Sequence, residues 1–391
     1  MNMTVLRIIV CTVLLHMAFS CLRLIASLDV LAHGATSFQT GVVVSLLAVG
    51  PTFAAVYCGR WIDRVGAKIP ELTGAACIAT ACSIAFFFPI TNETYVSLYI
   101  ACLIGGMGFM CIMMVSQQMV GMISTTKTRQ TNFSWLAMGL SASGLVSPIL
   151  AGTIIDQMGF QASFAAAIGL AALGTALFLL SMGKLPAAPV KSRVAKSKDG
   201  MFSLLRIPGV RHVLMVSALV SMAWDLQHFM FPVYGHAIGL SASEIGWLVG
   251  IFFSATFLVR FLLPLMAKYF TEWQFLTLTL FVGGLGYALF PFFDTFGTLA
   301  PVAFLLGLGL GASQPNVMTL LHTQSPQGRV GEAIGIRTMF TNGCHAILPT
   351  FFGALTAAVG VVSIFAAMTV LMTGSALASL QKYGRLGKTS S

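Results

Sequence analysis

Long apolar runs and short polar connections alternate from one end of the chain to the other. Each run holds about 20 residues, enough for a helix to cross about 30 Å of hydrocarbon. Backbone groups in lipid must hydrogen-bond within their own segment, and the sequence lacks the alternation of barrel strands, so the runs are predicted to be helices. The predicted spans are 5–28, 38–58, 70–90, 95–121, 133–155, 161–182, 212–236, 243–266, 273–293, 298–321, 331–356 and 361–380.

One connection is much longer than the others. Residues 184–211 begin K-L-P-A-A-P-V-K-S-R-V-A-K-S-K-D-G and have the composition of a flexible linker. This predicts an N-terminal six-helix bundle at 1–183, a basic cytoplasmic linker, and a C-terminal six-helix bundle with a short cytoplasmic tail at 212–391. Short matches between the halves, such as Gly41 with Gly246, indicate a duplicated six-helix unit.

Composition supports an all-α polytopic membrane protein. Only 8% of the residues are charged and 57% are hydrophobic, whereas about 25% of a soluble domain is charged. The eight cysteines lie in or beside apolar runs, with neither a C-x-x-C pair nor zinc-ligand spacing, and are interpreted as packing residues. No metal or cofactor is expected, and the sequence has no nucleotide loop or nucleophile motif that would indicate an enzyme.

The basic residues predict the orientation of the chain in the membrane. With the amino terminus in the cytoplasm, Lys and Arg outside the spans fall on cytoplasmic connections, linker and tails. The chain is therefore predicted to be a multi-pass inner (plasma) membrane protein with both termini cytoplasmic, monomeric in the lipid bilayer. The net charge of +10 is dispersed over these loops, which argues against nucleic-acid binding. The opposite loops receive no Lys or Arg, and they hold Asp29, Glu93, Asp156, Glu244 and Asp294.

The segment G-R-W-I-D-R-V-G-A-K at 59–68 concentrates four charges between the second and third spans. It resembles the signature loop of the major facilitator superfamily, roughly G-x-x-x-D-R/K-x-G-R-R/K, at the place where that family carries it, although Ala67 replaces a basic residue. Span count, linker and halves extend the resemblance over the whole chain. The resemblance implies a bacterial-type twelve-helix fold and transport of a small solute by alternating access.

In that family the acid of this loop meets the amino-terminal end of span eleven, where free N–H groups favour a carboxylate. The resemblance therefore implies a cytoplasmic gate in which Asp63 meets the start of span eleven and Arg129. Glu332 would pair with Arg60 or Arg64. The alternative is that this loop only fixes topology. The predicted gate residues are Gly59, Arg60, Asp63, Arg64, Gly66, Lys68, Arg129, Arg329 and Glu332.

Span five resembles a second motif of the family. The stretch S-A-S-G-L-V-S-P-I-L-A-G at 141–152 follows the antiporter motif G-x-x-x-G-P-x-x-G-G, with Ser and Ala in place of some glycines. Small residues keep this face suited to close helix packing, and the motif is associated with exporters. Span four departs from the proton-driven exporters, because Cys102 stands where many of them have an arginine ahead of G-x-G.

Few charges remain inside the spans: Arg23, Arg260 and Arg337, with Asp225 as the single acid by this count. A charged side chain costs at least about 2.5–3.5 kcal/mol at the helix centre, so each should face a cavity or a partner. The excess of positive charge suggests an anionic or carboxylate-bearing substrate. Asp225 and His228 lie about one turn apart on span seven and share a face.

By resemblance, spans one, four, seven and ten line a central cavity. Asp225, with His228, is predicted to couple protons. The alternatives are a structural Arg23–Asp225 bridge and arginines that reach toward cytoplasmic water; His16 and His345 are interpreted as packing residues. The predicted substrate-binding residues are Arg23, Gln117, Gln118, Trp135, Trp224, His228, Gln314, Asn316 and Arg337.

Together these patterns predict a proton-coupled transporter of a small organic solute, with efflux of an anionic or amphipathic metabolite or drug favoured. Uptake of an organic anion by symport is the first alternative. A non-transporting membrane receptor on the same scaffold is the second, and it would require a large signalling domain or a long tail.

Overall fold

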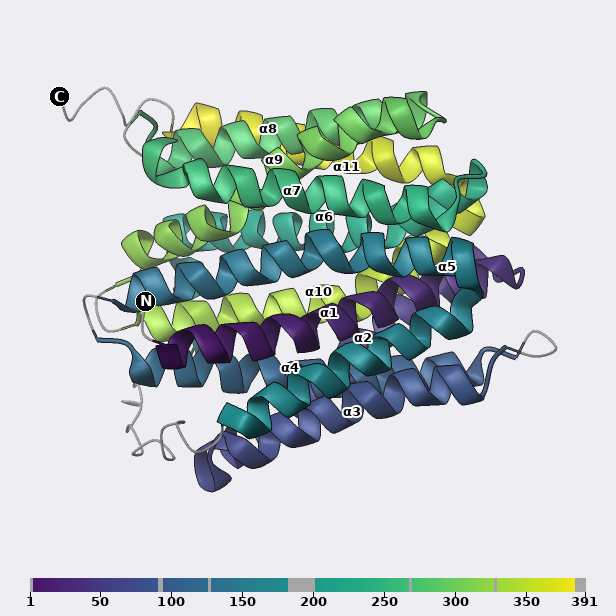
Figure 1. Ribbon diagram of the computed structural model, residues 1–391. Coiled ribbons are helices and arrows are strands. Elements are labelled where there is room, and N and C mark those ends of the chain that lie inside the picture. Colours follow the sequence, from purple (N-terminus) through teal and green to yellow (C-terminus); the bar gives the residue numbers. More distant parts are fainter. Residues whose placement is uncertain are drawn as a thin grey trace. The chain divides into compact units, whose positions relative to one another are not determined.

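The computed structural model describes residues 3–90, 94–125, 128–181, 201–266, 269–326 and 329–383. The linker residues 184–200 and the tail residues 384–391 lie outside the described part. Within it the chain forms eleven α-helices and two short 3-10 helices (Figure 1): α1 (Met3–Ala32), α2 (Ser37–Val65), α3 (Lys68–Phe87), α4 (Val96–Ile123), α5 (Arg129–Ser181), η2 (Met201–Arg206), α6 (Pro208–Ala237), α7 (Ala242–Met266), α8 (Glu272–Leu289), η3 (Phe290–Phe292), α9 (Phe296–Gln324), α10 (Val330–Val359) and α11 (Val361–Tyr383).

Each of the twelve predicted spans lies on one of these helices to within a few residues. The fifth and sixth spans share α5, in which Gly159 has non-helical angles of φ 84° and ψ 176°. A positive φ is readily accessible to glycine, so the chain can turn here between two spans. Ten of the described helices are long and apolar enough to cross a membrane, which confirms the all-α polytopic prediction.

The segment 59–68 is more helical than its prediction as a connection implies. α2 continues to Val65, and α3 begins three residues later. Gly66 caps α2 with a φ of 80°, a backbone angle that residues other than glycine rarely adopt. Arg60, Asp63 and Arg64 are therefore exposed side chains on the last turns of a helix.

Contacts within the chain group it into two compact units. The first holds residues 1–193 and 231–250, and the second holds 194–230 and 251–391. The last turns of α6 and the first turns of α7 thus belong to the first unit. Within the first unit α1 packs along α5, while α2 and α3 pack along α4; within the second, α8 packs against α9 and α11 (Figure 1).

One close helix contact occurs in both units. A Cβ placed on Gly106 of α4 would lie 2.0 Å from the carbonyl oxygen of Leu47 on α2. A Cβ placed on Gly307 of α9 would lie 2.2 Å from the carbonyl oxygen of Phe252 on α7. Leu47 and Phe252 keep the register in which the sequence matches the second and eighth spans. The repeated contact supports duplication of a helical unit, with glycine required where two backbones touch.

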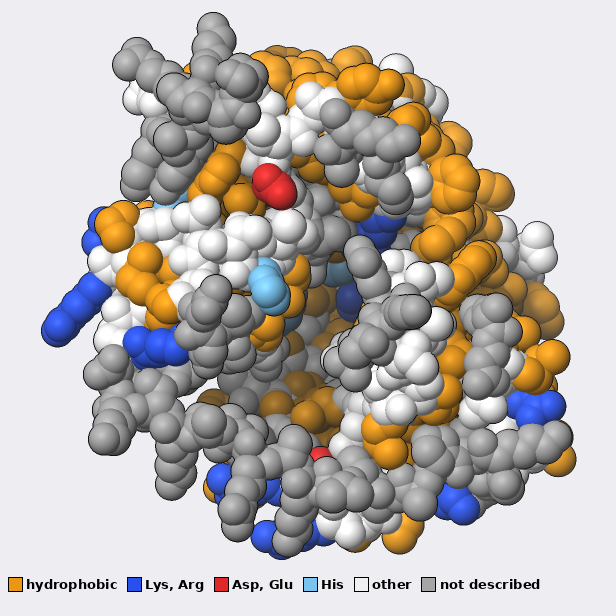
Figure 2. All heavy atoms as spheres, turned by 90° about the vertical axis from the view of Figure 1, so that its left-hand side faces the viewer, with side chains coloured by type: hydrophobic (Ala, Val, Ile, Leu, Met, Phe, Trp, Pro, Cys, Tyr) orange, Lys and Arg blue, Asp and Glu red, His pale blue; other side chains and the backbone are white. Residues whose placement is uncertain are grey.

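Apolar side chains cover much of the helix surfaces. Large examples are Phe53, Leu180 and Phe292, which are 75%, 82% and 79% exposed. Figure 2 shows hydrophobic side chains covering much of the top and right-hand side of the view, with Lys and Arg side chains scattered over the face turned to the viewer. An apolar flank of this extent suits contact with lipid, since soluble proteins seldom expose large apolar patches.

Candidate functional site

Polar side chains recur at every fourth residue along α6 and along α10 in the second unit. Residues four apart lie on the same face of a helix, so each set forms a polar stripe on an otherwise apolar element. The two stripes contact each other one turn after another. We call the six residues the polar ladder: Ser217, Ser221 and Asp225 on α6, and Arg337, Thr341 and His345 on α10.

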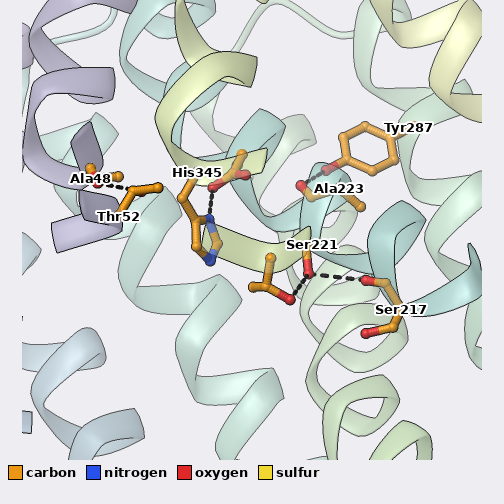
Figure 3. Close-up of polar contacts among 9 residues, drawn as sticks. Ala48, Thr52, Ser217, Ser221, Ala223, Tyr287 and His345 are labelled. Atoms are coloured by element: carbon orange, nitrogen blue, oxygen red, sulfur yellow. Dashed lines mark hydrogen bonds and ion pairs between the residues drawn. The ribbon is translucent and has the colours of Figure 1, made fainter. Parts of the chain in front are cut away.

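The first two contacts of the polar ladder join an arginine and two hydroxyl groups to their neighbours. Arg337 donates from Nε to Ser217 Oγ at 2.9 Å and from Nη2 to Gln314 Oε1 at 3.4 Å. Ser221 Oγ donates to the Ser217 carbonyl at 3.0 Å and lies 3.4 Å from Thr341 Oγ1 (Figure 3). Arg337 is thereby held by α6 and α9 through neutral groups.

The third contact joins Asp225 to His345. Asp225 is 5% exposed, and its Oδ1 contacts Nδ1 of His345, whose ring points toward it (Figure 3). Interpretation of His345 as a packing residue is therefore wrong, because the ring contacts the buried acid. His228 instead stacks on Phe253, with 6.1 Å between ring centroids. Spacing along the sequence predicts which residues share a face of one helix, but it does not show which residue of a distant helix contacts them.

Trp224 and Asn316, both predicted to bind substrate, are buried in helix contacts. Trp224 meets Phe252 edge to face with ring centroids 5.2 Å apart. Asn316 donates from Nδ2 to the carbonyl oxygen of Glu272 at 2.7 Å, which ties α9 to the start of α8. These contacts give both residues a role in packing the second unit.

Arg260 contacts backbone inside the second unit. Its Nε donates to the carbonyl oxygen of Gly311 at 3.2 Å, which joins α7 to α9. A guanidinium group that hydrogen-bonds a carbonyl oxygen in this way can hold two helices together.

In the first unit, Arg23 is half-buried on α1, with its guanidinium carbon 5.9 Å from the centre of the Phe19 ring. This is the geometry of a cation–π contact. Gln117 and Trp135 are exposed within the described residues, and Trp135 exposes 44% of its surface. Of these three predicted substrate residues, Arg23 is the one with a described contact to an aromatic ring.

The predicted gate residues occur in both units. In the first, Gln118 Nε2 donates to Asp63 Oδ1 at 2.9 Å, so this predicted substrate residue contacts the predicted gate acid. In the second, Arg329 Nη2 donates to Ser203 Oγ at 3.0 Å. The side chains of Arg129 and Glu332 lie outside the described residues.

The amino terminus of α7 is capped by side chains of the first unit. Asp156 accepts from the backbone N–H groups of Ala242 at 3.1 Å and Ser243 at 2.8 Å. Ser241 and Glu244 add a capping box, with distances of 2.9 and 3.2 Å. Four N–H groups that a helix start leaves without partners are thus satisfied, and a carboxylate lies at the positive end of the helix dipole.

Asp156 lies next to the Gly159 break of α5, outside both predicted spans of that helix. Burial acts to raise the pKa of Asp156, but hydrogen bonds from Ser243, Ser241 and Ala242 outweigh it and lower the pKa below its usual value. We call Asp156, Ser241 and Glu244 the α7 cap.

The small face of span five packs closely against α7. A Cβ on Gly152 would lie 2.2 Å from the carbonyl oxygen of Ala242, and one on Gly246 would lie 2.3 Å from that of Pro148. The close packing expected from the antiporter-like stretch is therefore present, and the α7 cap lies at its end.

Two acids are more deeply buried than the sequence analysis predicts. Glu71, in the first turn of α3, is 3% exposed, so the count of Asp225 as the single intramembrane acid is wrong. Asp29, assigned to an outer loop, is 5% exposed and lies 3.2 Å from His33 Nδ1, because α1 extends four residues beyond its predicted end. A carboxylate near a span boundary is easily assigned to the wrong side of it.

Both halves of the sequence match the model of one protein family. Residues 8–224 and 213–382 both match the model described as Major Facilitator Superfamily. The chain belongs to the Major Facilitator Superfamily. This major facilitator is therefore a multi-pass membrane transporter of a small solute and not an enzyme.

Two bacterial relatives resemble this major facilitator over most of their length. "Multidrug resistance protein 1" of Bacillus subtilis (strain 168) is 22% identical over 322 residues, which cover 81% of this chain and 80% of the relative. "Quinolone resistance protein NorA" of Staphylococcus aureus (strain MRSA252) is 22% identical over 362 residues, which cover 90% of this chain and 89% of the relative.

Solved structures show the same fold. A POT family transporter in complex with a thioalcohol-conjugated peptide has a TM-score of 0.78 at 14% identity, covering 96% of both chains. A single-residue mutant of the nucleoside transporter NupG has a TM-score of 0.74 at 17% identity, covering 96% of this chain and 99% of that one. At these identities the likeness concerns the major facilitator fold alone.

Proposed function

We propose that this major facilitator exports an anionic or amphipathic organic solute, a metabolite or a drug, in exchange for protons. The observation that carries the proposal is the contact of buried Asp225 with His345 in the polar ladder. The names of the two relatives and the antiporter-like stretch in span five favour export. Direction, coupling ion and substrate class are the parts of this proposal that experiment must test.

Proton coupling is assigned to Asp225 and His345 together. An ionisable group inside a transmembrane segment is costly and marks an ion or proton pathway by default. A histidine changes charge near physiological pH, and two contacting groups titrate as a pair. One proton entering the pair makes its net charge more positive by one elementary charge, and one proton leaving does the reverse. The charge seen by a solute therefore changes with the proton load.

The proposed negative charge of the solute follows from Arg337. Among the described residues, both hydrogen bonds of this guanidinium group go to neutral side chains, Ser217 and Gln314. A half-buried cation without a carboxylate partner is stabilised by an anion that binds beside it. Arg23, also predicted to bind substrate, is a half-buried cation on α1 of the first unit.

We place the protein in the inner (plasma) membrane as a monomer, with both termini in the cytoplasm and residues 59–68 at the cytoplasmic side. The proposed gate closes when Asp63 meets the amino terminus of α10, where N–H groups favour a carboxylate. The one-sided distribution of Lys and Arg supports this orientation.

Proton flux in reconstituted vesicles tests the proposal. Purified protein is placed in vesicles that contain a pH-sensitive dye, and organic acids and cationic drugs are added in turn. We expect an organic acid or amphipathic anion to drive proton flux opposite to its own movement. We expect Asp225→Asn to reduce that flux to the level of empty vesicles. The matched control is Asp294→Asn, which removes an exposed acid.

Three outcomes contradict parts of the proposal. Flux with cationic drugs alone overturns the anionic substrate. Solute and protons moving in the same direction establish uptake by symport, the first alternative. Full flux in Asp225→Asn overturns the coupling assignment.

A further inference from the structure

Glu71 is a buried acid that the proposed mechanism does not use. It lies in the first turn of α3, directly after the segment 59–68, and is 3% exposed. Within the part of the chain that the structure describes, its Oε2 has no hydrogen-bond partner. Asp225 is equally buried, but it contacts a histidine. Glu71 therefore needs another means of balancing its charge.

A cavity beside Glu71 offers that means. The cavity is small and partly open to solvent, with room for about one water molecule. α1, α3, α4 and the second part of α5 enclose it, all in the first unit. Its polar lining residues are Arg7, Cys11, Glu71, Ser116 and Ser181.

The titratable groups that face Glu71 are few. Arg7 on α1 lines the same cavity, and the thiols of Cys11 on α1 and Cys111 on α4 are close enough to interact with it electrostatically. The described part of α5 contributes Phe178 and Ser181, which do not titrate in this range. Arg7 is thus the one cation in the described lining.

A buried carboxylate is unfavourable when it is ionised and one of its oxygens has no hydrogen-bond donor. Two states relieve that cost here. In one state the carboxyl group keeps its proton. In the other it releases the proton to water in the cavity, and the guanidinium group of Arg7 moves toward the resulting carboxylate.

We propose that Glu71 is a second proton-binding site of this transporter, located in the first unit and served by the cavity beside Arg7. The inference rests on the proposed proton coupling and adds a named site to it. Each cycle moves one proton from water onto a Glu71 carboxylate oxygen and returns it to water, with no other bond made or broken. α3 begins just after Gly66, so attraction between Glu71 and Arg7 pulls on the start of α3 and on the adjoining segment 59–68. Proton release is thereby linked to the gate.

Glu71→Gln tests the site, since glutamine keeps the shape of a protonated glutamate and cannot release a proton. The first readout is the number of protons moved per solute, measured from the proton gradient that just balances a solute gradient. The second is the infrared band of protonated carboxyl groups, followed in the purified full chain during a pH titration. The matched control is Glu272→Gln, an exposed acid in the first turn of α8.

We expect Glu71→Gln to retain solute exchange between equal pools, to move one proton fewer per solute, and to lose one protonated-carboxyl band. Glu272→Gln should keep both properties. If Glu71→Gln fails to fold, Glu71→Asp serves instead, and its band should persist at a shifted frequency. An unchanged band and an unchanged proton ratio in Glu71→Gln overturn the proposal. Stimulation by Na⁺ at constant pH that Glu71→Gln abolishes also overturns it, in favour of a cation site.

The two proposals fail in different ways. Wild-type protein that moves no protons with any solute contradicts the proposed function, whereas the Glu71 band can still titrate. Loss of flux in Asp225→Asn with an intact Glu71 band supports both proposals. A Glu71 band that is absent in wild-type protein at every pH contradicts only the second site.

Discussion

Two buried carboxylates, one in each unit, have contrasting surroundings. Asp225 contacts His345 and belongs to the polar ladder between α6 and α10. Glu71 instead borders a cavity whose lining includes Arg7. Both are at most 5% exposed. The difference lies in the partner, because burial alone does not determine how an acid exchanges its proton.

The partner decides which groups share the proton. Asp225 and His345 form a coupled pair, so the charge of the pair depends on both groups. Glu71 has water and a movable arginine instead, so its charge follows proton access through the cavity.

Removal of His345 should have the largest effect, because it makes Asp225 resemble Glu71. A hydrogen bond to a charged group contributes about 1.5–3 kcal/mol, so proton-driven transport by His345→Gln should fall about tenfold to a hundredfold. The pH profile should also lose one of its steps. Transport rate against pH in vesicles measures both. His322→Gln, an exposed histidine on α9, is the control and should behave as wild type. A normal pH profile in His345→Gln would show that the Asp225–His345 contact has no part in coupling.

Giving Glu71 a partner should have an intermediate effect. Cys11 lines the same cavity, so Cys11→His places an imidazole near the carboxyl group. The added ring should form an ion pair with Glu71 and remove the protonated-carboxyl band near neutral pH. Overpacking costs about 1–3 kcal/mol, so the unfolding temperature should drop as well.

The control for this variant is Cys11→Ser, which keeps the small side chain and should leave the band in place. Infrared spectra of both variants over a pH series make the measurement. A band that Cys11→His leaves unchanged would contradict the position assigned to Glu71 in the cavity.

Much of the fold could be predicted from sequence, because twelve apolar runs specify helices without knowledge of packing. The sidedness inferred from the basic residues stays a prediction. The polar ladder left a partial signal: Ser217, Ser221 and Asp225 recur every four residues inside an apolar run. Its pairing with α10 could not be predicted, since the register between distant helices depends on packed backbones. Glu71 escaped prediction because it lies one residue inside a predicted span and next to the charged segment 59–68.

Asp156 of the α7 cap is an exposed acid, in contrast to the buried Asp225 and Glu71. Its substitution should therefore have the smallest effect of the three. Asp156 is held by backbone N–H groups, so Asp156→Ala should lower the free energy of unfolding by about 0.5–1 kcal/mol. Because its pKa is lowered in the folded protein, Asp156 stabilises the fold above its usual pKa. That contribution is lost as the pH falls through the lowered pKa. Thermal unfolding in detergent over a pH series should therefore show wild type and Asp156→Ala converging at acid pH, while the control Asp294→Asn follows wild type. A constant difference at every pH would mean that the carboxylate charge does not act in the cap.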